Sequence, residues 1–407
     1  MQTGDVVAGP GPSAAVSERV YYPELDGLRF VAFLAVYVFH GGVPQFGRWV
    51  NALAAGLTSL VPSARPWLPL NPGEAIRSNG WIGVQFFFIL SGYLISTLLL
   101  REEARYGRIS LRAFWVRRIL RIWPLYYLTL TLAFFALPWF DGVTPTTYGP
   151  GYGRHLPAFL VFAGNWSMAL LGPVGNDAIS ILWSVCIEEQ FYVLAPLLVA
   201  FVPPGGRLAV VVALMASAVA GRYALARAEA GPLLFQYNMI THLDTLLSGV
   251  LLALVWQRFP PDERTRRRLL WMRWPLGLAL IYLLSRPGLA HGSAARRTWD
   301  FVGLWVCGVG VVALARVGGG WLSALLANPR LVWLGRISYG LYMYHEIALW
   351  LSRRVDQWLG WFPNKEPLMA IGSFAATVLM AAVSYLVVER PFLKLKRGWT
   401  RVPSRPI

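Results

Sequence analysis

Long apolar stretches, separated by short polar segments, dominate this chain. About 20 predominantly apolar residues in an α-helix span the hydrocarbon core of a bilayer, and ten stretches of this chain come near that length. They cover roughly residues 27–44, 80–100, 118–138, 183–202, 207–225, 238–257, 270–285, 299–316, 333–352 and 368–388. The pattern therefore predicts an all-α integral membrane protein with about ten transmembrane helices.

An eleventh apolar stretch, 156–171, is ambiguous, and the distribution of basic residues decides how we interpret it. Residues 101–121 contain seven arginines, residues 258–273 contain six, and the tail from residue 389 contains six lysines or arginines. Short basic loops of membrane proteins face the cytoplasm. Ten crossings with both termini cytoplasmic place all three clusters there, whereas an eleventh crossing would put 258–273 outside. We therefore expect 156–171 to be re-entrant, interfacial or half of a broken helix.

Composition supports a membrane protein and divides the chain into three parts. Of the 407 residues, 56% are hydrophobic and only 14% are charged, whereas a soluble protein keeps about a quarter of its residues charged. The first 20 residues lack the charged-then-apolar order of a cleavable signal peptide. We expect 1–22 to be a disordered cytoplasmic leader, 23–392 the transmembrane domain, and 393–407 a basic cytoplasmic tail. The expected location is the inner (cytoplasmic) membrane.

The net charge of +17 does not indicate a nucleic-acid partner, because the basic residues cluster in short loops between apolar segments. The two cysteines, Cys186 and Cys307, lie in apolar stretches without the spacing of metal ligands. We expect no disulfide framework, no metal site and no permanently bound cofactor.

Arg29 and His40 lie in one apolar segment, LRFVAFLAVYVFH (28–40), where ionisable side chains are costly. A helix turns about 100° per residue, so Arg29 and His40 share one face, roughly 16 Å apart, and Asp26 lies one turn earlier on nearly the same face. A polar face in an apolar helix predicts a cavity filled with water or substrate, where a neutral imidazole acts as a general base. The alternative is a buried histidine bonded to a neighbouring helix.

The densest basic region enters the third predicted span as FWVRRILRIWPLYY, which contains Arg117, Arg118 and Arg121. Arginines three or four residues apart lie near one another on a helix. They could orient the protein by reaching anionic lipid. They could also clamp the phosphates of a cytoplasmic donor, for which the guanidinium fork is well suited.

Further polar residues lie near the starts of later spans. Glu188 and Glu189 in WSVCIEEQFY are neighbours on a helix, so they point about 100° apart and at most one reaches a central cavity. Buried acids are costly, so they either serve the site or form structural ion pairs. In HLDTLLSG, Gly249 is expected to let a neighbouring helix approach closely. Additional cavity candidates are Trp183, Asp244, Tyr342 and His345.

Six motifs together resemble acyltransferase family 3, the integral-membrane O-acyltransferases that modify bacterial surface polysaccharides, peptidoglycan, lipid-linked sugars and some macrolides. The resemblance runs from about Leu25 to Pro391. LDGLR followed by His40 is similar to the family's Arg-x10-His signature, and WIGVQFFFILSGYLI (81–95) is similar to its second-span motif. FWVRRILRIWPLYY, WSVCIEEQFY, HLDTLLSG and SYGLYMYH match further family motifs in the same order. The resemblance implies that the signature histidine is catalytic and that the paired arginines are linked to acyl-CoA use.

The chain departs from the family pattern near the last motif. Glu346 and Ile347 follow His345 where many members have a proline, which leaves the role of His345 open. Residue 186, often serine in the family, is cysteine. We expect the stand-alone form of the family, without a hydrolase-like domain after the last predicted span.

We predict a membrane-embedded O-acyltransferase that moves an acyl group, expected to be acetyl, from cytoplasmic acyl-CoA to a hydroxyl of a sugar-containing acceptor. Such acceptors include a surface polysaccharide, a lipid-linked sugar and a glycosylated metabolite. The predicted catalytic residues are His40 as base, Arg29, Asp26, Glu188 and Glu189, and the predicted donor-binding residues are Arg117, Arg118 and Arg121. Direct transfer is simpler than a covalent intermediate, for which Cys186 remains the candidate. The alternative function is a transporter or flippase that uses the same buried polar residues as a substrate or proton path.

Overall fold

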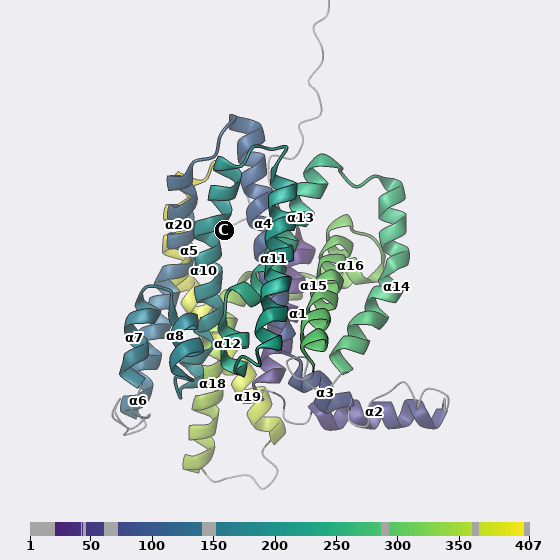
Figure 1. Cartoon of the computed structure of the whole chain (residues 1–407). Helices are drawn as coiled ribbons and strands as arrows, with labels where there is room; N and C mark the ends of the chain where they lie inside the picture. Colours follow the sequence, from purple (N-terminus) through teal and green to yellow (C-terminus); the bar gives the residue numbers. More distant parts are fainter. Residues whose placement is uncertain are drawn as a thin grey trace, which may run out of the picture.

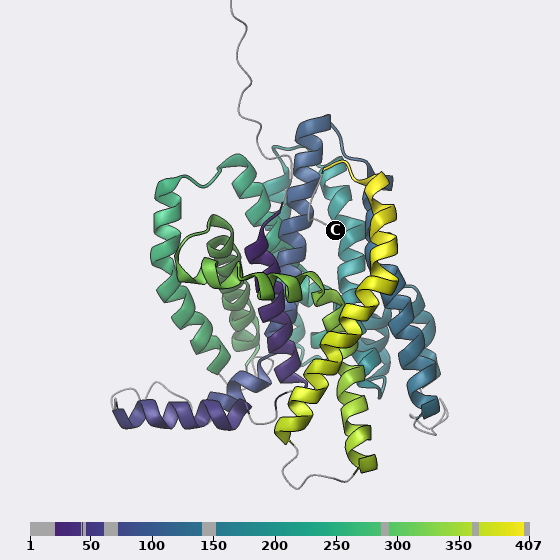
Figure 2. The ribbon, with the colours of Figure 1, turned by 180° about the vertical axis from the view of Figure 1, so that it is seen from behind.

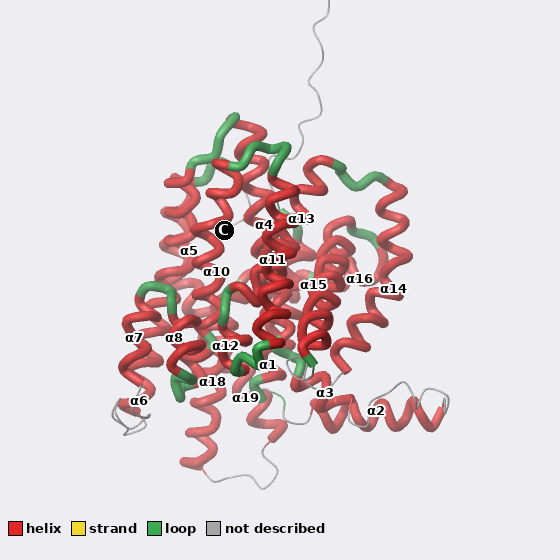
Figure 3. Tube along the Cα trace, in the orientation of Figure 1, coloured by secondary structure: helices red, strands yellow, loops and turns green. Residues whose placement is uncertain are grey.

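The computed structural model describes residues 21–41, 43, 46–60, 72–140, 152–285, 293–359 and 366–402. Within these ranges every regular element is a helix (Figure 3), which confirms the all-α prediction. The long helices are α1 (Pro23–Phe39), α4 (Ile82–Tyr106), α5 (Leu111–Thr131), α10 (Leu182–Phe201), α11 (Arg207–Arg227), α13 (Ile240–Arg258), α14 (Glu263–Ser285), α15 (Ala294–Val317), α18 (Ser338–Leu359) and α19 (Glu366–Ser384). The shorter ones are α2 (Phe46–Leu60), α3 (Pro72–Ser78), α6 (Leu137–Phe140), α7 (Tyr152–Leu160), α8 (Gly164–Leu171), α9 (Asp177–Ser180), α12 (Pro232–Tyr237), α16 (Gly320–Leu326), α17 (Pro329–Arg336) and α20 (Arg390–Leu395).

Among the described residues, each range that the hydrophobic pattern assigned to the membrane contains helix. Among the described residues, seven helical stretches are long and apolar enough to cross a bilayer. They are Ile82–Tyr106, Leu111–Phe140, Asp177–Phe201, Arg207–Arg227, Pro232–Arg258, Ala294–Val317 and Leu368–Trp399. The chain is therefore a multi-pass membrane protein. The remaining predicted ranges are filled by α1, α14 and α18, which are not in this set, so ten crossings stay a prediction.

The ambiguous stretch 156–171 is divided between two short helices. α7 and α8 have nine and eight residues, and the chain turns between them at Phe162, which has a φ of 56°. A helix rises about 1.5 Å per residue, so neither is long enough to cross the hydrocarbon core alone. The stretch is therefore not a single crossing helix.

The predicted span 333–352 is wrong at its start. The helix is interrupted at Ile337. The residues before it belong to α17, which packs against α1. A Cβ on Gly335 would overlap the backbone of Asp26. The absence of a side chain at this glycine lets the two backbones approach closely.

The last predicted span, 368–388, is longer than expected. A π-helical turn, Tyr385–Glu389, follows α19 and leads directly into α20. Pro391 is the second residue of α20, shortly after the π-helical turn. Helical structure therefore continues into the predicted tail, as far as Trp399. The leader residues 1–20 and the tail residues 403–407 lie outside the described residues.

Helices α4 and α13 pack along much of their length. A Cβ on Gly249 of α13 would overlap the carbonyl of Ile89 on α4. A Cβ on Gly92 of α4 would likewise overlap the carbonyl of Leu246. The predicted close approach at Gly249 is confirmed. This packing fixes the position of α4 in the bundle.

The long helices run back and forth along one axis of the bundle (Figures 1 and 2). The arginine-rich end of α4 and start of α5, the junction of α13 with α14, and α20 all lie at the end where α1 begins. At the opposite end, α2 lies across this axis. The three basic clusters therefore share one end of the molecule, as their expected location on one side of the membrane requires.

Candidate functional site

A cavity of about 140 Å³ lies where α1, α4, α5, α10 and α18 meet. Apolar side chains of α4, among them Phe87 and Leu94, form part of its wall. Its polar lining residues are Tyr21, Tyr22, Asp26, Arg29, Ser91, Arg118, Arg121, Ser184, Glu188, Tyr192, Ser338, Tyr339 and Tyr342. The polar face predicted for the start of α1 therefore borders a cavity, and five elements contribute to that cavity.

Three arginines face this cavity and differ in their partners. Arg29 lies 3.4 Å from Asp26 across one helical turn, measured from Nη1 to Oδ1. Arg118 stacks over the rings of Phe114 and Tyr192 at 5.5 and 5.6 Å. Within the described residues, neither Arg118 nor Arg121 has a hydrogen bond or ion pair. Two guanidinium groups are thus available to an anionic ligand.

Arg117, the third arginine of the predicted clamp, points elsewhere. Its Nη2 is 3.1 Å from Oε2 of Glu102, and its Nη1 donates to the carbonyl of Trp399 at 2.8 Å. Glu102 is buried and also accepts from the Ser110 amide. The structure therefore places two of the three predicted donor-binding arginines on the cavity and the third in an ion pair that ties α4, α5 and the final turn together.

The adjacent acids of α10 separate as their helical spacing predicts. Glu188 lines the cavity and accepts hydrogen bonds from Ser91 at 2.9 Å and from Tyr192 at 2.8 Å. Glu189 accepts from the indole of Trp123 at 3.0 Å and does not line the cavity. Of the pair, Glu188 is the carboxylate within reach of a ligand held by the arginines.

His40 lies outside the cavity lining, directly after the last residue of α1. Its Nδ1 is 3.0 Å from the carbonyl of Val36 and 3.2 Å from Nε2 of His345. The side chain of His40 is 26% exposed, whereas that of His345 is fully buried. His40 is therefore bonded to a histidine of a neighbouring helix, as the alternative to catalysis expects. Its exposed edge nevertheless leaves the ring accessible.

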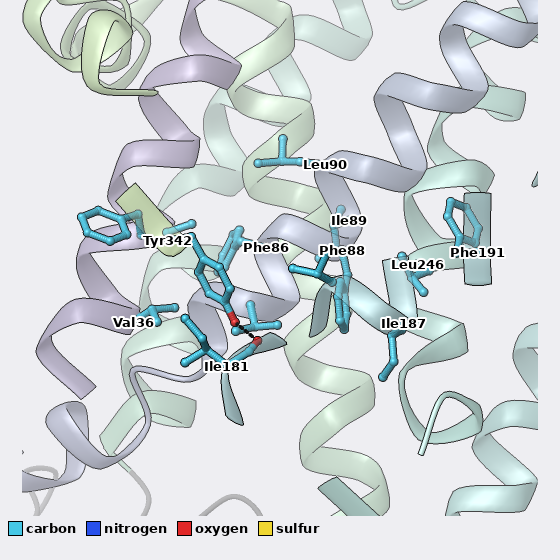
Figure 4. Close-up of a cluster of buried hydrophobic side chains, with 14 of the residues drawn as sticks. Val36, Phe86, Phe88, Ile89, Leu90, Ile181, Ile187, Phe191, Leu246 and Tyr342 are labelled. Carbon is cyan, nitrogen blue, oxygen red and sulfur yellow. Dashed lines mark hydrogen bonds between the residues drawn. The ribbon is translucent and has the colours of Figure 1, made fainter. Parts of the chain in front are cut away.

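Tyr342 lies between the cavity and this histidine pair. Its hydroxyl is 2.7 Å from the hydroxyl of Ser184 and donates to the carbonyl of Ile181 at 3.0 Å (Figure 4). Its ring borders the cavity and lies 5.6 Å from the ring of His345, centroid to centroid. The carbonyl of Tyr342 in turn accepts from Nδ1 of His345 at 2.6 Å. This one residue connects the two parts of the candidate site.

The other predicted cavity residues have structural partners. Asp244 forms a fully buried ion pair with Arg222, which also bonds to the Thr241 carbonyl. Trp183 packs against the ring of His242 at 5.3 Å, and neither borders the cavity. The Cys186 thiol is 3.5 Å from the hydroxyl of Tyr126, also away from the cavity. Asp244, Trp183 and Cys186 therefore lie outside the site.

Sequence reasoning missed several hydroxyl groups of the lining. Tyr192 follows Glu188 by four residues, so their shared helical face was a usable signal. Ser91 on α4 had no such signal, because its bond to Glu188 joins residues 97 positions apart. Tyr339 lines the cavity from α18, which is far from α10 in the chain, so only tertiary packing brings it to the site. Contacts of this kind depend on the fold.

The chain belongs to acyltransferase family 3, because the model of that family's acyltransferase domain matches residues 22–387. The match includes α1 with Arg29, α5 with its arginines, and α18 with Tyr342 and His345. The resemblance stated from the motifs is confirmed. The membrane helices and the family together identify a membrane acyltransferase.

Relatives give this class a narrower description. The peptidoglycan O-acetyltransferase OatA of Listeria monocytogenes is 27% identical over 403 residues, covering 92% of this chain and 56% of that protein. The putative peptidoglycan O-acetyltransferase YrhL of Bacillus subtilis is 27% identical over 395 residues, covering 91% of this chain and 55% of its own length. A putative O-acetyltransferase of Staphylococcus aureus is 25% identical, with 92% and 58% covered. The chain thus spans little more than half the length of these relatives. No solved structure shows a significant match.

Proposed function

We propose that the chain transfers an acetyl group from acetyl-CoA, held at the arginine-lined cavity, to a hydroxyl group of a glycan, with His40 as the general base. The observation that carries this proposal is the cavity itself, where Arg118 and Arg121 face the interior without an acidic partner among the described residues. Arg29 borders the same cavity from the helix that ends at His40.

The proposed topology has ten crossings of the inner (cytoplasmic) membrane, with both termini in the cytoplasm. α1, α14 and α18 complete the set of seven apolar stretches. The common end of the three basic clusters supports this orientation, because short basic segments are retained on the cytoplasmic side. The cavity includes Tyr21 and Tyr22 at the start of α1, so it reaches toward this end.

The cavity charge favours an anionic donor from the cytoplasm. Three guanidinium groups face two carboxylates, those of Asp26 and Glu188. The phosphates of coenzyme A suit the guanidinium fork, and their bonds are stronger in a partly buried site than in water. Arg118 and Arg121 would bind these phosphates, while Arg29 would orient the thioester or stabilise the negative charge that develops on its carbonyl oxygen.

The chemical step moves one proton and one acyl group. The Nδ1–H of His40 donates to the Val36 carbonyl, which leaves Nε2 as the basic nitrogen of the neutral ring. Nε2 accepts the proton of the acceptor hydroxyl, whose oxygen attacks the thioester carbon. The carbon–sulfur bond breaks, and the departing sulfur takes the proton from His40. The products are an O-acetyl ester and free coenzyme A.

The acyl end of the donor has to pass Tyr342 to reach His40. In this conformation the Tyr342 ring borders both the cavity and His345, and its hydroxyl is held by Ser184 and the Ile181 carbonyl. We therefore include a rotation of this side chain in the proposal. The acceptor would approach from the exposed edge of His40, at the end of the bundle opposite the basic clusters. A peptidoglycan or other surface glycan fits this direction and the names of the relatives.

A transfer assay in proteoliposomes tests this proposal. Acetyl-CoA with a radiolabelled acetyl group would be supplied with peptidoglycan fragments, and the glycan would then be treated with hydroxylamine, which releases O-acetyl esters. The proposal predicts label on the glycan that hydroxylamine removes. Movement of acetyl-CoA or glycan across the membrane with no ester formed would favour the transporter instead.

A further inference from the structure

His40, His345 and Glu346 form a group that the proposed transfer uses only in part. One ligand-type atom from each residue lies within 4.8 Å of the other two. Oε1 of Glu346 is 3.7 Å from Nε2 of His40 and 3.8 Å from Nε2 of His345. The histidines are 305 positions apart in the chain, so only the packing of α1 against α18 assembles the group.

Both imidazole rings are oriented by backbone carbonyls. Nδ1 of His40 faces the Val36 carbonyl at 3.0 Å, and Nδ1 of His345 faces the Tyr342 carbonyl at 2.6 Å. A carbonyl only accepts hydrogen bonds, so both Nδ1 atoms carry the proton and both Nε2 atoms carry a lone pair. Metal-binding histidines are typically held in this way, with the second ring nitrogen donating to a carbonyl or carboxylate.

The Glu346 carboxylate is buried beside the two imidazoles, and no lysine or arginine of the described residues pairs with it. Its side chain is 3% exposed, and among the described residues the basic nitrogens within 4 Å of it belong to the two imidazoles. A charged carboxylate in a low-dielectric site is costly unless a positive charge or several donors compensate it. A bound divalent cation would supply that charge.

The ligand set favours a transition-metal ion such as Zn²⁺ over Mg²⁺ or Ca²⁺. Two imidazoles and one carboxylate bind Zn²⁺ in a tetrahedral site whose fourth position stays open, whereas Mg²⁺ and Ca²⁺ prefer oxygen ligands. Bonds of about 2.0–2.2 Å place tetrahedral ligand atoms roughly 3.4 Å apart. The two separations from the carboxylate, 3.7 and 3.8 Å, are within a few tenths of an ångström of this value, and all three ligand atoms lie within 4.8 Å of one another. The lone pair of His345 Nε2 now faces Nδ1 of His40 at 3.2 Å. A bound metal ion would take the place of this contact.

We propose that His40, His345 and Glu346 bind Zn²⁺, and that the bound ion inhibits acyl transfer by occupying Nε2 of His40. The inhibition rests on the proposed function, because it follows only if that nitrogen is the base. The binding itself does not depend on it. The partly exposed ring of His40 gives a hydrated ion a route to the site.

The first test is a titration of the purified, chelator-treated full chain with Zn²⁺ by isothermal calorimetry. Wild type would be compared with Glu346→Gln and with the control His155→Gln, which removes a buried imidazole bonded to Ser167 on a different helix. We expect one Zn²⁺ per wild-type chain and an affinity at least about tenfold weaker in Glu346→Gln. His155→Gln should bind as wild type does. Binding below one ion per chain, or equal affinity in all three proteins, would overturn the site.

A second measurement separates the site from the transfer reaction. Acetyl transfer with and without Zn²⁺ would be compared for each protein against its own metal-free rate. Inhibition of wild type that is weakened at least tenfold in Glu346→Gln supports the proposal, whereas stoichiometric binding without inhibition overturns the competition for Nε2. If wild type transfers no acetyl group at all, the proposed function fails, and the calorimetric result still decides the metal site. Equal thermal midpoints of the metal-free proteins would show that Glu346→Gln folds normally.

Discussion

Arg29 borders the central cavity, whereas His40, eleven residues later on the same helix face, lies outside that lining and contacts His345 at 3.2 Å. The two ends of α1 therefore meet different surroundings. Arg29 lies among arginines and hydroxyl groups, and His40 lies beside a second imidazole and a carboxylate. In the proposed mechanism the first end binds the donor and the second end transfers the proton.

Replacing the base should separate binding from chemistry. His40→Gln should lower the rate of acetyl transfer by about 10²- to 10⁴-fold, because general base catalysis is lost. The affinity for acetyl-CoA should stay within about threefold of wild type, since His40 is not part of the cavity lining. Release of the coenzyme A thiol measures the rate, and calorimetry measures the affinity. A variant that keeps more than about a tenth of the rate would exclude His40 as the base.

The arginine cluster should divide into two classes. Arg117→Ala leaves the buried carboxylate of Glu102 without its main partner, so the free energy of unfolding should fall by about 3 kcal/mol. Arg118→Ala should instead weaken acetyl-CoA binding. Thermal unfolding in detergent and calorimetry measure the two effects. Equal loss of donor affinity in both variants would show that Arg117 also reaches the donor.

The two adjacent acids should differ in the same assay. Glu188→Gln should lower the transfer rate at least about tenfold without weakening acetyl-CoA binding, because the carboxylate positions Ser91 and Tyr192 in the cavity but repels the donor's phosphates. Glu189→Gln should cause a smaller loss, since an amide oxygen still accepts from Trp123. The reverse order of the two rates would mean that Glu189 turns into the cavity during the reaction.

The packing of α4 against α13 should be sensitive to a single side chain. Gly249→Leu should destabilise the protein by about 1–3 kcal/mol or more, because the new side chain overlaps the Ile89 carbonyl. Gly277→Leu on α14 is the matched control, since a Cβ there meets no atom within 4 Å. The midpoints of thermal unfolding measure both. Similar midpoints for the two variants would contradict the close approach.

Much of the fold could be predicted from the hydrophobic pattern, because a bilayer imposes helices of nearly fixed length. The break at Ile337 could not, since Gly335 is needed there for contact with Asp26, 309 positions earlier in the chain. The extension of the last helix past Pro391 was also missed. A π-helical turn, Tyr385–Glu389, precedes that proline, and the helix continues through it.

Only part of the candidate site could be predicted from the sequence. Helical spacing separated Glu188 from Glu189 and placed Arg29 on a cavity. It could not show that Arg117 pairs with Glu102 instead of facing the donor, because helical spacing puts Arg117 and Arg121 on the same face. Nor could it bring His345 to His40. Those contacts arise from how separate helices pack, which local periodicity does not encode.

Donor binding at the arginine-lined cavity is tested by the affinity of the purified chain for acetyl-CoA in wild type, Arg121→Ala and Arg268→Ala. Arg121 faces the cavity, whereas Arg268 is an exposed arginine of α14 and serves as the control. We predict that Arg121→Ala weakens binding by about 10- to 100-fold, the loss expected for charge-assisted bonds to phosphate, and that Arg268→Ala does not. Wild-type protein that binds no acetyl-CoA, or equal affinity in all three proteins, would contradict it.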